Sequence, residues 1–224
     1  MARTRRTRSA SKPTAQGQRA KVVWLSLMGA MTALGGLLLV LDPGRSNHAG
    51  GSAIPALAAT GTSDSLERIF TGVRAPLAGE RWKAIVVHHS ASNFASPDTI
   101  AVQHQRQGLK KMGHHFVIGN GSGMGDGEIH VGERWLMQEA GAHASGKDGK
   151  WFNQHAISIC LVGNGDQRSF SRQQLAKLDQ LVASLQAELN IPANRVYLHS
   201  DIAPISDPGR NFPAEDFRAA LSQR

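Results

Sequence analysis

The stretch from Trp82 to Ser90, WKAIVVHHS, constrains the fold of this chain more than any other. Its central residues, AIVV, are all apolar, so neither side of an extended chain would be polar here. Strands of this kind are usually covered on both faces, which predicts a central strand of a sheet. Two histidines and a serine close the run, and open sheets place their chemistry at such strand ends. Because successive side chains point to opposite faces, His88 and His89 are not expected to enter the same site.

The rest of the chain after this strand alternates predicted strands with predicted helices. Further strands are predicted over residues 115–119, 128–132, 156–162 and 195–199, and helices over residues 96–107, from Ser171 onward and from Pro213 onward. Ser171 and Gln174 form a capping box, and leucines follow at helical spacing as an ordinary core stripe. Residues 135–153 are expected to be irregular. The pattern predicts an α/β fold, with a mixed central β-sheet and helices on its faces.

Charge is distributed unevenly along the chain. The first 21 residues hold seven of the 25 basic side chains and no acidic one. The remaining 18 basic residues stand against 17 acidic ones, so the rest of the chain is close to neutral. Most of the net charge of +8 therefore comes from the N-terminal tail, and the folded part is not expected to have a basic face. A nucleic-acid-binding function would rest on that tail alone, and we expect none.

Residues 22–41 contain no charged side chain and are long enough to cross a bilayer as a helix. The basic flank before them predicts an N-terminus in the cytoplasm and the remainder outside it. The alternative is a cleaved signal peptide, although the apolar run is long for one and the best small-residue site, Ala56-Leu57-Ala58, lies well beyond it. We therefore expect a basic cytoplasmic tail (1–21), a transmembrane anchor (22–41), a flexible Gly/Ala/Ser/Pro-rich linker (42–65) and a folded domain (66–224).

Cys160 is the only cysteine, so no disulfide can form within the chain. It lies in the apolar run AISICLVG, with no neighbour that would lower the pKa of its thiol. A buried structural thiol is expected rather than a nucleophile.

A second histidine, His199, follows another short apolar strand, and Asp207 lies eight residues later in HSDIAPISDPG. Two imidazoles and one carboxylate would suit a catalytic zinc site that keeps a position open for water. On spacing alone, hydrogen-bonded structural histidines and a turn aspartate explain the pattern equally well.

The ordered motifs IVVHHSAS, GHHFVIG, GEIHVG, GAH, AISICLVGN and LHSDIAP…DPGRNFP resemble the type 2 N-acetylmuramoyl-L-alanine amidases. This family includes phage amidases and the animal peptidoglycan recognition proteins. The resemblance covers about residues 81–213, and it implies a zinc enzyme that cuts the amide between N-acetylmuramic acid and L-alanine in peptidoglycan. By position, it makes His88, His199 and Asp207 the zinc ligands. It gives His89 a supporting or packing role.

The resemblance also implies roles for residues around the metal. His114 stands where phage and animal members have Tyr, and it is the candidate acid/base or oxyanion donor, with a merely structural role as an equal alternative. Ile205 stands where phage members have Lys, and its side chain can neither transfer a proton nor donate to an oxyanion. His143, Arg210 and Asn211 are candidate substrate contacts, and His115 is expected to pack.

Two functions follow from this pattern. The first is a zinc-dependent peptidoglycan amidase tethered to the inner membrane, with its catalytic domain outside the cytoplasm. The alternative is a weakly active or inactive peptidoglycan-binding module of the same fold, which the loss of Tyr and Lys would favour.

Overall fold

The computed structural model describes residues 64–223, and side chains from Leu66 onward. Five strands form one sheet in the order β3-β2-β4-β1-β5. They are β1 Ala84–His89, β2 Phe116–Ile118, β3 Ile129–Val131, β4 Ala156–Leu161 and β5 Val196–Leu198. Only the pairing of β2 with β3 is antiparallel, and β1 lies between the parallel strands β4 and β5. The predicted α/β fold with a mixed sheet and an interior β1 is confirmed.

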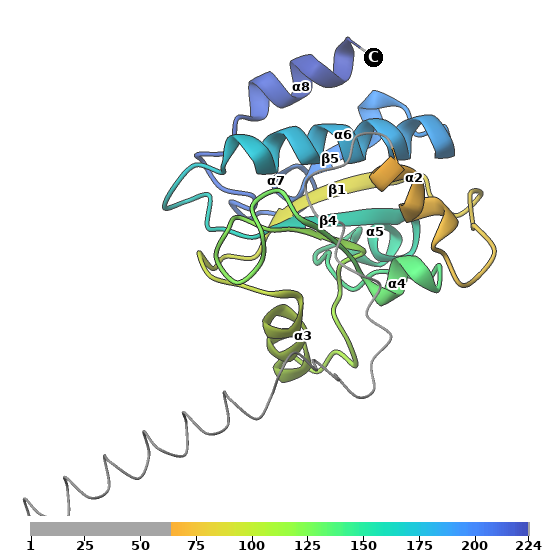
Figure 1. Ribbon diagram of the computed structural model, residues 1–224, viewed down its shortest axis with the longest axis horizontal. Helices are drawn as coiled ribbons and strands as arrows, with labels where there is room; N and C mark the ends of the chain where they lie inside the picture. The colour runs from red at the N-terminus through yellow and green to blue at the C-terminus, as the bar shows by residue number, and fades with distance from the viewer. Residues whose placement is uncertain (1–63, 224) are drawn as a thin grey trace, which may run out of the picture. The chain divides into compact units, whose positions relative to one another are not determined.

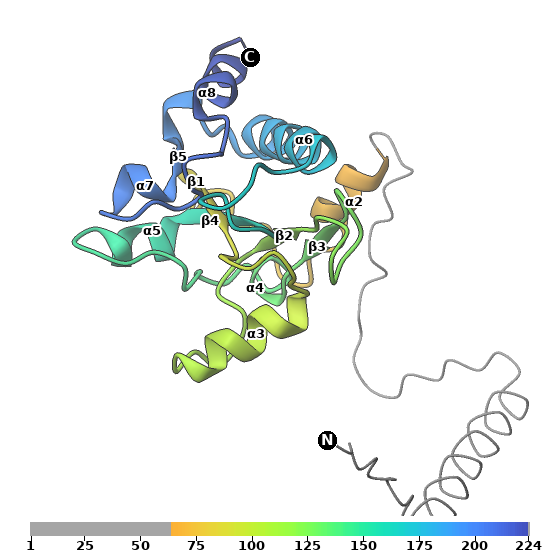
Figure 2. The same cartoon turned by 90° about the vertical axis from the view of Figure 1, so that its left-hand side faces the viewer.

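Helices cover both faces of the sheet (Figures 1 and 2). They are α2 Asp64–Thr71, α3 Pro97–Arg106, α4 Glu133–Leu136, α5 Gly149–His155, α6 Arg172–Leu189, α7 His199–Ile202 and α8 Ala214–Ser222, with a 3₁₀ turn η1 Ala193–Arg195. On one face, the apolar stripe of α6 packs against the large aliphatic residues of β1 and β4. On the other face, α3 and α5 bury Ile100 and Phe152 against smaller side chains of the same strands.

The start and the end of the long helix α6 are both set by local sequence signals. The Ser171 side chain accepts a hydrogen bond from the backbone N–H of Gln174, and the Gln174 side-chain oxygen accepts one from the backbone N–H of Ser171, as the capping box predicts. The helix ends at Asn190, whose φ of 54° lies in the left-handed region that Asn tolerates well. The last helix also confirms its prediction, since Pro213 precedes it and Phe217 and Leu221 are buried.

Two expectations about local structure were wrong. Residues 135–153 are not irregular throughout, because they contain α5 and the end of α4. These helices have four and seven residues and no side-chain cap, so no local signal marks them. They form where Trp135 and Phe152 are buried by contacts from distant parts of the chain. His199 does not close a strand either, because β5 ends at Leu198 and His199 begins α7.

Helix α2 was not predicted. It buries Ile69 in the core of the α6 face, and the Trp135 indole N–H donates to the carbonyl oxygen of Ile69. Within residues 64–223, no helix is both long and apolar enough to cross a membrane. The predicted tail, anchor and most of the linker lie outside the described residues, so the division of residues 1–65 stays a prediction.

Candidate metal centre

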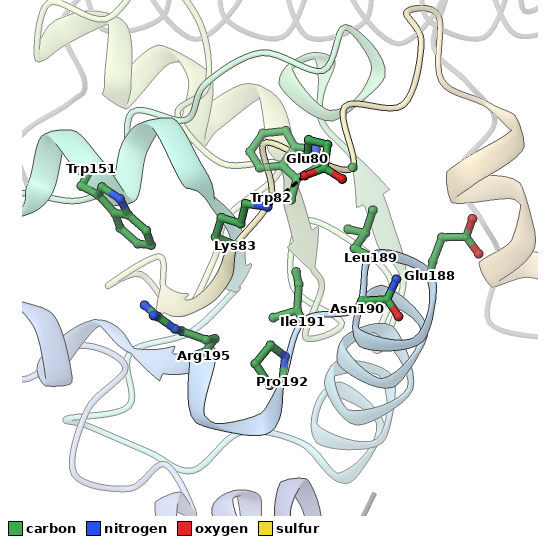
Figure 3. A pocket seen from close by; sticks show the side chains of 11 residues that line it. Glu80, Trp82, Lys83, Trp151, Glu188, Leu189, Asn190, Ile191, Pro192 and Arg195 are labelled. Carbon is green, nitrogen blue, oxygen red and sulfur yellow. Dashed lines mark hydrogen bonds and ion pairs between the residues drawn. The ribbon is translucent and has the colours of Figure 1, made fainter.

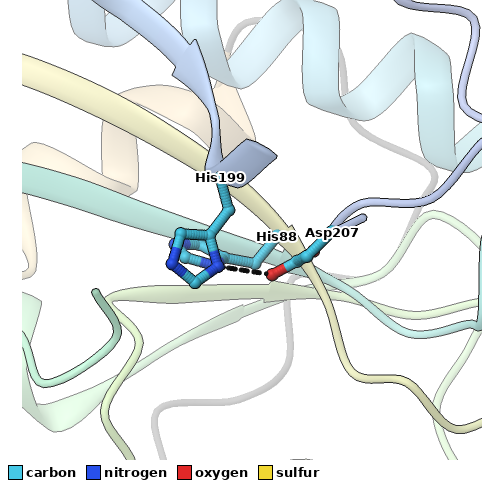
Figure 4. Close-up of side chains that lie close together, drawn as sticks. All are labelled: His88, His199 and Asp207. Atoms are coloured by element: carbon cyan, nitrogen blue, oxygen red, sulfur yellow. Dashed lines mark hydrogen bonds and ion pairs between the residues drawn. The ribbon is translucent and has the colours of Figure 1, made fainter. Parts of the chain in front are cut away.

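His88, His199 and Asp207 meet at the carboxyl edge of the sheet (Figure 4). Strand β1 delivers His88 there, and the adjacent strand β5 delivers His199 one residue after its end. Asp207 arrives from the loop between α7 and α8. The two imidazoles are only 2% and 6% exposed. The structure therefore brings together all three residues that the resemblance implied.

Both carboxylate oxygens of Asp207 have partners, and one of them lies between the two histidine rings. Its Oδ2 lies 3.0 Å from His88 Nδ1 and 2.8 Å from His199 Nδ1. Its Oδ1 accepts a hydrogen bond of 2.6 Å from the backbone N–H of His89. Burial by itself would raise the pKa of Asp207, but the hydrogen bonds with His199 and His88 outweigh it and hold this pKa below its usual range. The carboxylate is therefore ionised near neutral pH.

This cluster fits a metal ion. One ligand atom from each of the three residues lies within 4.8 Å of the others. His199 Nε2 is buried and has no hydrogen-bond partner among the described residues, which is uncommon for a buried polar atom. Two imidazoles and one carboxylate form a donor set that suits catalytic zinc with one position left open.

His143 contacts the cluster directly. Its Nδ1 lies 3.0 Å from His88 Nε2, so one of these two nitrogens donates to the other. Burial, followed by the neighbouring His88, lowers the pKa of His143 well below its usual value. Its Nε2 is buried and unpaired among the described residues. His143 was predicted to contact substrate, which stays a prediction; the structure adds that it orients His88.

His114 is the next closest imidazole. Its ring centroid lies 5.1 Å from that of His88, and its Nδ1 lies 2.6 Å from the hydroxyl oxygen of Ser158. Burial and then the nearby His88 lower the pKa of His114 well below its usual value, so the ring is neutral near pH 7. A neutral imidazole can accept a proton, which is the base role among those predicted for His114.

The neighbours of these two residues behave as expected. His89 points to the opposite face, where its Nδ1 accepts a hydrogen bond from the backbone N–H of Gly165. His115 is fully buried and accepts the Ser158 backbone N–H at Nδ1, while its Nε2–H donates to the Glu139 carbonyl. Both residues support the site from outside it.

The predicted residues at the edge of the site differ in their contacts. Asn211 donates both its backbone N–H and its side-chain amide to the Gly165 carbonyl, so its amide helps to fold the loop. Arg210 is exposed, and its backbone N–H donates to Asp166. Ile205 is 42% exposed. Substrate contact by Arg210 and Asn211 stays a prediction.

Two residues near the site were missed from sequence. Ser158 had a signal, because it is a polar residue inside the apolar run of β4. His104 had none: it lies in α3, and only the fold brings its ring to 5.2 Å from that of His114. Cys160 is confirmed as a buried thiol, and burial raises its pKa well above the usual value.

The fold and the site together define a class: an α/β domain with a buried two-histidine, one-carboxylate centre where parallel strands end. Within that class, the sequence matches the N-acetylmuramoyl-L-alanine amidase family over residues 78–210. The match covers more than half of the 224 residues and contains all three candidate ligands, so the chain belongs to this family. The resemblance seen in the motifs is confirmed.

Similar proteins agree with this assignment. The chain is 31% identical to the endolysin of Enterobacteria phage T3 over 134 residues, which cover 56% of this chain and 80% of the endolysin. It is 30% identical to the endolysin of Escherichia phage T7 over 137 residues, covering 58% and 82%. Among solved structures, the endolysin amidase LysCS from Clostridium intestinale aligns with a TM-score of 0.55 at 30% identity, over 63% of this chain and 84% of LysCS.

Proposed function

We propose that this amidase hydrolyses the bond between N-acetylmuramic acid and L-alanine in peptidoglycan with a zinc ion held by His88, His199 and Asp207. Family membership supports the reaction. The observation that carries the metal is the placement of three ligand atoms within 4.8 Å, together with the orphaned Nε2 of His199.

His88, His199 and Asp207 would hold the zinc ion, which would supply a water of lowered pKa and polarise the scissile carbonyl. The protein holds the ligand side chains in fixed orientations through hydrogen bonds. The backbone N–H of His89 fixes Asp207, and the pairing of His88 Nε2 with His143 Nδ1 fixes the tautomer and orientation of the His88 ring. If His88 carries its hydrogen on Nε2, it donates to His143 Nδ1, and a neutral His143 then carries its own hydrogen on Nε2.

His114 is the candidate proton-transfer residue. It lies beside His88, and Ser158 holds its Nδ1, so the hydroxyl orients the ring. This position carries Tyr in the phage and animal enzymes that the sequence resembles. Ile205, which stands in place of their Lys, has no group to transfer a proton. His114 would therefore take the proton of the attacking water and pass it to the departing amine.

The metal and the reaction are tested together on the full chain, purified in detergent. We expect about one zinc per wild-type chain by elemental analysis and release of free L-alanine amines from peptidoglycan. His88→Ala should lose both. His130→Ala is the matched control, because His130 lies on the edge strand β3 and outside the cluster.

The alternative, a binding module, has its own observation in its favour: the exposed Ile205 offers no charge at the site. It predicts zinc and peptidoglycan binding without amine release by wild type. A wild-type protein that binds no zinc would contradict the proposed centre itself.

The location is proposed from sequence alone. A charge-free segment over 22–41 with a basic flank supports a single-pass anchor in the inner membrane, with the catalytic domain on the periplasmic side. The tether would restrict wall cleavage to a layer near the membrane. Full-length protein in the membrane fraction, digested by protease added to spheroplasts, is the expected result. A shortened, soluble form would instead indicate a cleaved signal peptide.

A further inference from the structure

A second cavity, of about 440 Å³, opens at a place that the amidase site does not use (Figure 3). One wall is the segment that leads into β1, including Glu80 and Lys83, and the other is the turn from the end of α6 to η1. Trp151 of α5 and Arg195 flank one end. Its buried lining residues are Trp82, Leu189 and Ile191.

This cavity lies at the edge of the sheet opposite the candidate metal centre. Lys83 directly precedes β1 and Arg195 directly precedes β5, whereas His88 and His199 lie at the other ends of the same strands. Six strand residues span about 20 Å. A ligand in this cavity therefore cannot touch the reacting bond.

Hydrogen bonds hold both walls in place. Gln138 accepts from the backbone N–H of Ala78 and from the Trp82 indole, which fixes the segment before β1. On the other wall, the Gln186 side chain donates to the Ile191 carbonyl, and Asn190 caps α6. The cavity is preformed, as ligand-binding sites usually are.

The side chains around the cavity indicate the chemistry of a ligand. Two basic residues, Lys83 and Arg195, are balanced by two acidic ones, Glu80 and Glu188, so the cavity does not favour a strongly charged ligand. Within residues 64–223, no hydrogen bond or ion pair engages the Arg195 guanidinium or the Glu188 carboxylate, which leaves both able to bond with hydroxyl and amide groups.

Trp151, at one end of the cavity, limits the chemical class of ligand that would fit. Trp151 is 38% exposed, although an indole of this size is normally highly buried. Its ring packs edge-on against Phe152, and its centroid lies 5.3 Å from that of the His155 ring, so both neighbours orient it. An exposed indole beside polar groups whose charges balance matches a pyranose ring, whose C–H groups pack on an aromatic ring while its hydroxyls bond at the edges.

We infer that this cavity binds an N-acetylhexosamine unit of a glycan strand. The inference rests on the proposed function, because it takes the ligand to be a part of the peptidoglycan polymer that is remote from the amide being cut. A site of this kind would hold the enzyme on the polymer while the metal centre acts elsewhere.

The test is calorimetric titration of the full chain with chitotetraose, an N-acetylglucosamine oligomer that has no stem peptide and cannot be a substrate. Wild type should bind, and Trp151→Ala should weaken binding about tenfold or more. Trp151→Phe should retain most of the affinity. Arg195→Ala should weaken binding several-fold, and this exposed position keeps the test valid if the tryptophan variant fails to fold.

Val102→Ala is the matched control, because Val102 is also an exposed apolar residue but lies on α3, outside the cavity. It should bind chitotetraose as wild type does. No binding by wild type, or equal binding by wild type and by both the Trp151→Ala and Arg195→Ala variants, would overturn the inference.

Hydrolysis assays separate this inference from the amidase itself. Trp151→Ala should cleave a soluble muropeptide at the wild-type rate but cut insoluble peptidoglycan several-fold more slowly. If wild type cleaves neither substrate yet binds chitotetraose through Trp151, the proposed function fails and the glycan site stands. If both substrates are cut equally well by wild type and variant, a role of the cavity in polymer cleavage is ruled out.

Discussion

The two faces of β1 and β4 show how one sheet separates stability from chemistry. On the α6 face, β1 contributes Ile85 and Val87 and β4 contributes Ile157 and Ile159, all fully buried. The other face carries, in the same two strands, Ala84, Val86, His88, Ala156, Ser158 and Cys160. The first face is uniformly large and apolar, whereas the second is small and becomes polar toward the carboxyl edge.

The difference between the two faces shows which residues stabilise the fold and which make room for the site. Large aliphatic side chains against a long helix bury the most apolar area, so the α6 face provides most of the free energy of folding. Small side chains on the other face leave room for imidazoles from His114 and His143 beside His88. Damage to one face should therefore unfold the protein, and damage to the other should disable it without unfolding it.

The sharpest test of this separation is Asp207→Asn. The substitution keeps the volume but removes the charge that faces both histidines, so zinc occupancy should be lost and amidase activity should fall by at least about 100-fold. Activity and elemental analysis measure both. Asp166→Asn is the control: Asp166 accepts bonds from Ser206 and Arg210 nearby but touches no histidine ligand, and it should stay active. Similar activity losses in the two variants would mean that the loop, not the ligand, matters.

On the α6 face, Leu181→Ala should lower the free energy of unfolding by about 2–5 kcal/mol. Leu181 is fully buried, so shortening its side chain leaves a cavity in the core. Denaturant titration of the metal-free protein measures this loss. Activity of the folded fraction at low temperature should be unchanged. Leu175→Ala, on the same helix but only partly buried, should cost less. A Leu181→Ala protein that is folded but inactive would contradict the idea that the α6 face affects stability alone.

The histidines of the site face should make the metal-free protein sensitive to acid. Burial lowers the pKa of His115 from 6.5 to about 4. The unfolded chain therefore binds more protons between these two pH values, and the free energy of unfolding falls as pH decreases through this window, by roughly 3 kcal/mol from His115 alone. Urea titrations at pH 7 and pH 4.5 measure the change.

His115→Gln should reduce that pH dependence, since a glutamine does not titrate. A pH dependence that is equally steep in His115→Gln would assign the effect to other buried histidines.

The smallest expected effect is that of His143→Ala. Loss of the partner of His88 Nε2 should weaken zinc binding by about 10–100-fold while the protein stays folded. Competition with a chelator measures the affinity, and circular dichroism checks the fold. If zinc affinity is unchanged but KM rises, His143 is a substrate contact, as first predicted, and does not position the ligand.

Much of the architecture was readable from local patterns. The apolar runs of β1 and β4, the Ser171 capping box and the leucine stripe of the 18-residue helix α6 are each local in sequence, and each formed as predicted. The short helices α4 and α5 were missed because their stability comes from burying Trp135 and Phe152 against distant residues. The three candidate ligands were predicted from ordered family motifs, since spacing alone left structural histidines as an equal explanation.

The sequence by itself determined the buried central strands, the long helix α6 and the buried thiol, and its family motifs named the candidate ligand residues. Only the tertiary structure decided that His88 and Asp207, 119 residues apart, share a hydrogen bond, that His143 pairs with His88, and that Ser158 holds His114. Local structure follows from the periodicity of neighbouring side chains, which the sequence displays directly. The site depends on which strands pair and how loops close over them, and that choice is made by the packing of the whole core.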